Sequence, residues 1–304
     1  MDQSALLQEI EPVAGELLNR HLGVAKEWFP HEMVPYSRGK DFVAGSQWDK
    51  NDADFGLVSN EMSDAVRASL YVNLLTEDNL PYYFRDIDQL FGSDGAYGEW
   101  GRNWTAEEGR HSIVIRDYLT VTRAIDPVAL ERARMQQVRS GQVPAPLDIY
   151  EALAYLSMQE LATRIAHRNT GKMMNDEVGE AIMSRVGNDE NLHYLFYRDL
   201  ATAAIAVDPS NMVIGIERAV RTFAMPGTGI TDFEKLSREI ARVGIYDLLI
   251  HHDQILQPVV MRHWKLEQLS GLTDEAEKAR EALFKRIERI GKVGAKMASD
   301  RVSA

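Results

Sequence analysis

The stretches Glu108-Gly109-Arg110-His111 and Glu190-Asn191-Leu192-His193 decide the fold, because each places a glutamate three residues before a histidine. On an α-helix, residues three apart lie on one face, with Cβ atoms about 5–6 Å apart. One carboxylate and one imidazole can then reach the same metal ion. Two such segments could arise by chance among 8 histidines. The positions of other glutamates therefore decide whether the two segments belong to one site.

Two further glutamates precede these segments at nearly equal distances. Glu77 lies 31 residues before Glu108, and Glu160 lies 30 residues before Glu190. Two antiparallel helices joined by a short turn bring residues equidistant from the turn to the same depth. Each helical hairpin can therefore set its single glutamate level with its Glu-x-x-His segment. Packing two such hairpins together predicts an all-α fold with a ferritin-like, long four-helix bundle core and additional helices.

The predicted bundle brings four carboxylates and two imidazoles to one level. Oxygen ligands combined with imidazole suit iron or manganese. The alternative is that these are surface glutamates on amphipathic helices. However, Glu77 and Glu160 stand within apolar runs, where an unpaired charge is costly to bury. The predicted metal ligands are Glu77, Glu108, His111, Glu160, Glu190 and His193.

Two more carboxylates, Glu107 and Asp189, each directly precede a motif glutamate. A metal-bound histidine usually donates its other ring N–H to a carboxylate. We therefore expect Asp189 beside His111 and Glu107 beside His193. Simple charge pairing at a helix surface is the alternative for both.

Helical periodicity dominates the chain, and no linker rich in Pro, Gly or Ser divides it. We interpret residues 1–304 as a single domain. It comprises an N-terminal helix and irregular segment (1–58), the core bundle (about 59–207) and a basic C-terminal helix (274–304). Pro81 lies four residues after Glu77 and should bend its helix there. The predicted helices span residues 4–22, 59–90, 97–125, 128–139, 147–170, 176–207, a segment ending at 223, 232–243, 246–270 and 274–299.

Composition excludes several classes of protein. The chain contains no cysteine, so disulfides, thiolate metal sites and iron–sulfur clusters are excluded. A net charge of -12 argues against nucleic-acid binding, which needs a basic surface. The acidic N-terminal segment lacks an apolar signal region, and no run of about 18 apolar residues appears. We therefore expect a cytoplasmic protein that does not interact with membranes.

At this point several segments resemble one family, the soluble acyl-ACP desaturases of plant plastids and actinobacteria. The resemblance extends from about Glu11 to the region of Tyr246. Its most specific segments are Trp28-Phe29-Pro30-His31-Glu32, Thr76-Glu77-Asp78-Asn79-Leu80-Pro81-Tyr82, Trp104-Thr105-Ala106-Glu107-Glu108-Gly109-Arg110-His111, Gln159-Glu160-Leu161-Ala162-Thr163 followed by His167-Arg168-Asn169-Thr170, Asp189-Glu190-Asn191-Leu192-His193, and Met225-Pro226.

The resemblance implies two iron ions per chain, bridged by carboxylates and held by the six ligands above. It also implies that a saturated acyl chain on acyl carrier protein gains a cis double bond, with O2 and two electrons from a ferredoxin-like donor. In such enzymes Thr163 would assist O2 activation, and Trp28, Asp189 and His111 would form an electron path. The alternatives are a helix Thr bonded to its own backbone and an ordinary core Trp. A homodimer is also implied.

Three rival functions remain at the level of sequence. One is another di-iron oxygenase, such as a hydroxylase or an N-oxygenase. The second is a non-catalytic iron-binding bundle, and the third is a metal-free helical scaffold. Acidic partners would need a local basic surface, for which residues 285–301 and the group Arg132, Arg134 and Arg139 are candidates. For residues 285–301 we favour a solvated amphipathic helix.

Overall fold

The computed structural model describes residues 2–50, 62–224, 227 and 229–302, and every regular element in these ranges is helical. The all-α prediction is therefore confirmed. The predicted start of a helix at Ser59 and the Met225-Pro226 turn lie outside the described residues.

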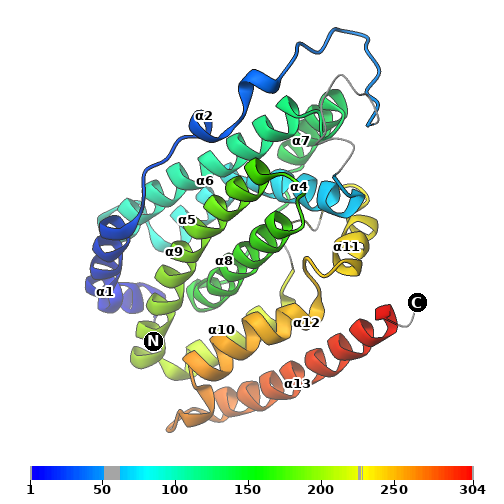
Figure 1. The fold of residues 1–304 in the computed structure, drawn as a ribbon. Helices are drawn as coiled ribbons and strands as arrows, with labels where there is room; N and C mark the ends of the chain where they lie inside the picture. The colour runs from blue at the N-terminus through cyan, green and yellow to red at the C-terminus, as the bar shows by residue number, and fades with distance from the viewer. Residues whose placement is uncertain (1, 51–61, 225–226, 228, 303–304) are drawn as a thin grey trace.

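Four helices carry the motif residues: α4 (Asp64–Glu77), α6 (Gly95–Val121), α8 (Ile149–Lys172) and α9 (Glu177–Val207). In Figure 1, α6, α8 and α9 run side by side along the long axis of the molecule. α8 is buried on nearly all sides, because α4, α9 and α10 (Pro209–Thr222) all pack against it. The side chain of Asp148 accepts a hydrogen bond from Glu151 N and caps α8, and Asp176 caps α9 in the same way through Gly179 N.

The remaining helices surround this core. α1 (Gln3–Val24) packs against α6 and α9, and the short α2 (Pro30–Met33) and η1 (Tyr36–Arg38) follow it. α7 (Pro127–Ser140) connects α6 to α8, and α11 (Phe233–Arg242) packs on α4. α13 (Asp274–Val302) lies along the outer side of α10 and α12, at the bottom of Figure 1.

The single helix predicted over residues 59–90 is wrong. α4 begins at Asp64 and ends at Glu77, and a separate helix, α5 (Leu80–Phe91), follows. Pro81 has no N–H to offer the Glu77 carbonyl, and it lies in the first turn of α5, where that N–H is not needed. The expected bend is thus a complete interruption, which places Glu77 at the very end of a helix.

The helix predicted over residues 246–270 is also interrupted. α12 (Leu248–His251) continues directly as a π-helix, η3 (His252–His263), and a short 3₁₀ turn, η4 (Leu266–Gln268), follows. Pro258 lies inside η3 and removes one backbone donor, so an uninterrupted α-helical ladder cannot form there. At the end of η3, Trp264 N donates to Val259 O, five residues back.

Three of the six basic residues in the segment 285–301 pair with acidic neighbours. Lys285 contacts Glu281, Lys292 contacts Glu288, and Arg301 reaches Asp247 before α12. In the second basic group, Arg134 pairs with Asp78 and Glu131. These pairs favour the interpretation of α13 as a solvated amphipathic helix.

His251 provides a test of this region by pH. It is buried, its Nδ1 lies 2.9 Å from the Tyr246 hydroxyl, and its ring packs on Phe223. Burial lowers the pKa of His251 to about 4, so the folded protein disfavours the protonated form. The stability that depends on neutral His251 is fully present above the ordinary pKa of about 6.5. It declines as pH falls below that value and is lost as pH falls through 4.

We therefore expect the wild type to lose about 2 kcal/mol more unfolding free energy between pH 7.5 and pH 5 than the His251→Leu variant. Urea unfolding of both proteins at the two pH values measures this difference. Exposed carboxylates titrate equally in both proteins and cancel in the comparison. Equal losses in the two proteins would contradict the assigned pKa.

Candidate metal centre

Six buried side chains from four helices meet in the middle of the bundle. Glu77 ends α4, Glu108 and His111 lie one turn apart on α6, Glu160 projects from α8, and α9 supplies Glu190 and His193. Ligand atoms within 4.8 Å of one another form two groups, which share Glu108 and Glu190. The groups are Glu77, Glu108, His111 and Glu190, and Glu108, Glu160, Glu190 and His193.

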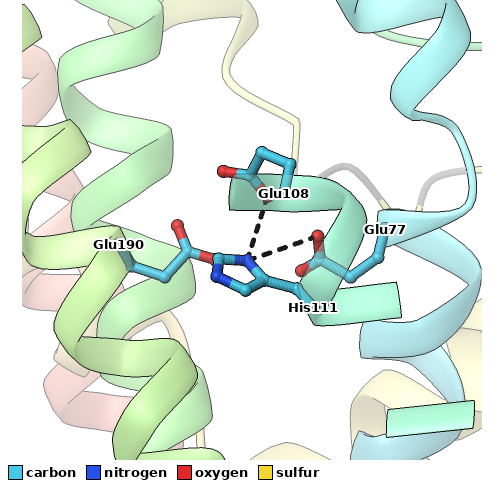
Figure 2. Close-up of side chains that lie close together, drawn as sticks. All are labelled: Glu77, Glu108, His111 and Glu190. Atoms are coloured by element: carbon cyan, nitrogen blue, oxygen red, sulfur yellow. Dashed lines mark hydrogen bonds and ion pairs between the residues drawn. The ribbon is translucent and has the colours of Figure 1, made fainter. Parts of the chain in front are cut away.

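Figure 2 shows the first group, with Glu77, Glu108 and Glu190 directed toward the His111 ring from three different helices. His111 Nδ1 lies 3.1 Å from Glu108 Oε2, 3.6 Å from Glu190 Oε1 and 3.9 Å from Glu77 Oε2. In the second group, His193 Nδ1 lies 2.9 Å from Glu108 Oε1 and 3.6 Å from Glu160 Oε2. The two oxygens of Glu108 therefore face different histidines.

The electrostatics of the cluster show why it suits cations. Burial, together with the nearby charge of Glu108, raises the pKa of Glu77 to about 8, and burial raises the pKa of Glu160 well above its ordinary range. Although burial also acts on Glu108, the adjacent His111 and His193 hold its pKa well below the ordinary value. Four carboxylates this close cannot all stay ionised without compensating positive charge.

Unpartnered buried atoms are an independent reason to think that these side chains bind two metal ions. Among the described residues, buried Glu160 Oε2 has no hydrogen-bond partner, and His193 Nδ1 forms no hydrogen bond of normal geometry although it lies 2.9 Å from Glu108 Oε1. Such orphaned atoms are costly unless something coordinates them. Carboxylate oxygens and imidazole nitrogens in two groups with two shared carboxylates match a bridged pair of iron or manganese ions.

The outer ring nitrogen of His193 lies beside Glu107, and that of His111 lies beside Asp189, as expected from the sequence. His193 Nε2 lies 2.8 Å from Glu107 Oε2, and His111 Nε2 lies 3.5 Å from Asp189 Oδ2. The Trp28 indole N–H donates to the same Asp189 oxygen at 2.7 Å, and Arg185 pairs with the other. Although burial opposes it, hydrogen bonds from His111 and Trp28 lower the pKa of Asp189. Both contacts face the interior, unlike surface charge pairs.

Thr163 lies one turn from Glu160, and its hydroxyl contacts both the backbone of its own helix and a cluster carboxylate. Its Oγ1 is 3.0 Å from the Glu160 carbonyl oxygen and 3.3 Å from that of Gln159, as in a backbone-bonded helix threonine. The same hydroxyl lies 2.9 Å from Glu190 Oε2. It therefore touches a carboxylate that both groups share.

Two buried histidines beside the cluster were missed from the sequence. His21 on α1 places Nε2 3.1 Å from Glu107 Oε1, which extends the contacts behind His193. His167 on α8 places Nε2 3.3 Å from Glu190 Oε1 and 3.4 Å from Glu77 Oε1. A signal existed for His167, because a residue seven positions after Glu160 lies on the same face of a helix.

A narrow pocket begins at the cluster and leads away from it between α5 and α8. Glu77, Glu108, Glu190 and Thr163 form one end. Trp104 borders it and donates its indole N–H to Glu160 Oε1 at 3.2 Å. Most of the wall is apolar, so the pocket suits a hydrocarbon chain. Its apolar lining includes Leu80, Ile87, Leu90, Ala152, Tyr155 and Leu156.

Fold and site together define a class of helical-bundle proteins whose core holds a paired carboxylate–imidazole cluster suited to two metal ions. The family model described as fatty acid desaturase matches residues 2–304. The chain belongs to the fatty acid desaturase family, and it is accordingly an oxidoreductase of the desaturase class. The non-enzymatic alternatives are therefore set aside.

Individual relatives agree with this assignment. The chain is 41% identical over 288 residues to a Mycobacterium tuberculosis H37Rv protein named as acyl-[acyl-carrier-protein] desaturase DesA1, across 91% of this chain and 83% of that relative. It is 32% identical over 251 residues to the chloroplastic stearoyl-[acyl-carrier-protein] 9-desaturase 6 of Arabidopsis thaliana, across 75% of this chain and 63% of that relative.

A solved structure shares the fold. The X-ray structure of acyl-ACP desaturase DesA2 from Mycobacterium tuberculosis H37Rv superposes with a TM-score of 0.69, at 23% identity, over 90% of this chain and 99% of that chain. No helix within the described ranges is both long and apolar enough to cross a lipid bilayer.

Proposed function

We propose that this protein is a di-iron acyl-[acyl-carrier-protein] desaturase that introduces a cis double bond into a saturated acyl chain, with O2 and two electrons from a ferredoxin-like donor. One observation carries the proposal: the apolar pocket ends on Glu77, Glu108, Glu190 and Thr163 of the carboxylate–imidazole cluster. A chain held in this pocket would present its methylene groups directly to the metals.

In this proposal Glu77 and His111 would hold one ion, Glu160 and His193 would hold the other, and Glu108 and Glu190 would contribute to both. When bound, the iron pair supplies the O2-dependent oxidation that breaks two unactivated C–H bonds. The protein itself positions the substrate and keeps water away from the reacting atoms. The apolar walls exclude bulk water and align the acyl chain.

The residues around the cluster have separate roles in this proposal. Asp189 and Glu107 orient His111 and His193, and the hydroxyl of Thr163 provides a hydrogen-bond donor beside Glu190 at the end of the pocket. Trp28 donates to Asp189, and its ring lies nearly parallel to that of His111 with centroids 6.4 Å apart. We assign Trp28 to the route by which electrons enter. We also propose a homodimer that receives acyl-ACP and the electron donor.

The test is turnover of defined substrates. Iron-reconstituted protein is incubated with stearoyl- or palmitoyl-ACP, O2 and reduced ferredoxin, and the released fatty acids are analysed by mass spectrometry. Products lighter than the substrate by two hydrogens support the proposal. A hydroxylated acyl product would instead identify an oxygenase, and O2 consumption without any modified acyl chain would sink the proposal.

A further inference from the structure

His167 is a buried histidine at the metal centre that the proposed ligand set does not use. It lies on the inner face of α8, two turns beyond Glu160, and is 1% exposed. Its Nδ1 has no hydrogen-bond partner among the described residues, and its Nε2 likewise forms no hydrogen bond of normal geometry there. Buried polar ring atoms left without partners are costly, so the charged groups beside the ring should account for the presence of this side chain.

The other nitrogen, Nε2, lies between two carboxylates from different helices. It is 3.4 Å from Glu77 Oε1 at the end of α4 and 3.3 Å from Glu190 Oε1 on α9. His167 belongs to neither group of ligand atoms that lie within 4.8 Å of one another. Nε2 is therefore close enough to both carboxylates for its N–H to donate to them after a small side-chain adjustment, whereas the ring is not placed to bind an ion itself.

Glu77 and Glu160 each belong to only one of the two ligand groups, and a different aromatic N–H lies beside each of them. Glu160 accepts the indole N–H of Trp104 at 3.2 Å, and Glu77 has the imidazole Nε2 of His167 at 3.4 Å. A carboxylate oxygen held by a fixed donor leaves its second oxygen to the metal, and this constraint reduces the freedom lost when the ion binds.

We propose that His167 is a positioning residue for the ion held by Glu77 and His111: its Nε2–H holds one oxygen of Glu77, which belongs to this ion's ligands alone, and thereby sets the affinity of this ion more than that of the other. The inference rests on the proposed two-metal function. Partners of metal ligands typically change affinity about 10- to 100-fold when they are removed.

Three substitutions separate this role from simple packing. In His167→Gln the amide nitrogen stands near the position of Nε2, whereas in His167→Asn it stands near Nδ1. His167→Leu keeps an apolar side chain and removes both donors. We expect the Leu and Asn variants to bind one of two Co²⁺ ions about 10- to 100-fold more weakly, and the Gln variant to bind it within a few-fold of wild type.

Co²⁺ titration of metal-depleted protein, followed by visible absorption, measures both affinities without turnover. Trp104→Phe is the matched control, since it removes the N–H to Glu160 and should weaken the other ion. The double variant His167→Leu/Trp104→Phe should therefore weaken both ions. Circular dichroism shows whether each variant folds. If the Leu variant does not fold, the comparison of the Gln and Asn variants still tests the role of His167.

Two results would overturn the inference: wild-type affinities in the folded His167→Leu variant, or equal behaviour of the Asn and Gln variants. Failure of the proposed function gives a different result. In that case the wild-type protein itself binds fewer than two Co²⁺ ions per chain, whatever residue 167 is.

Discussion

Replacing Glu108 with alanine is expected to remove both metal ions, reducing the bound metal from two ions per chain to near none. Glu108 is the side chain whose two oxygens approach both cluster histidines, at 3.1 Å from His111 Nδ1 and 2.9 Å from His193 Nδ1. It also belongs to both groups of ligand atoms. Its loss should therefore damage two sites at once, and product formation should fall below detection.

Metal analysis of reconstituted protein measures this effect directly. Glu99→Ala is the matched control, because Glu99 lies on the same helix α6 with its side chain exposed. Glu108→Gln keeps the side-chain volume and removes only the charge, so it distinguishes a lost ligand from a cavity. Two ions per chain in a folded Glu108→Ala protein would contradict the shared role of this residue.

Removal of the metals is expected to have the second largest effect, on stability rather than on chemistry. A ligand that binds only the folded state adds about 4 kcal/mol when its free concentration is about 1,000 times its Kd. Two ions under such conditions should raise the Tm on the order of 10 °C or more in a chain of this size. The reason is local: the buried carboxylates of Glu77, Glu160 and Glu190 are compensated only in part by the neighbouring histidines.

Calorimetry before and after chelation, and again after Fe²⁺ or Co²⁺ is restored, checks this expectation. The Glu108→Ala variant is the control, since chelator should leave its Tm nearly unchanged. An identical Tm for metal-loaded and metal-depleted wild type would show that the cluster is satisfied without ions.

Much of the fold and the cluster could be predicted from the chain because the relevant information is periodic. The 3.6-residue repeat places Glu108 and His111 on one face wherever that helix lies. The nearly equal spacings of 31 and 30 residues then bring Glu77 and Glu160 to the level of their partners. Neither step needs knowledge of how the helices pack. The structure indeed brings all six side chains together.

Helix interruptions were harder to predict, because they depend on competition between backbone and packing. Pro81 predicts that the helix is disturbed, but the sequence does not distinguish a bent helix from two separate helices. In the structure α4 ends at Glu77 and a new helix, α5, begins at Leu80. Similarly, the apolar pattern of residues 246–270 fits an α-helix, and the π-helical stretch His252–His263 has no periodic signature in one sequence.

The sequence by itself determined the class of the protein: the helical bundle, the identity of the six cluster residues and the carboxylates that stand next to two of them. Only the tertiary structure decided which groups face one another across helices. The contacts of His21 with Glu107, and of His167 with Glu77 and Glu190, join elements far apart in the chain. Their cause is helix packing, which sets rotation and depth between helices and which local spacing does not encode.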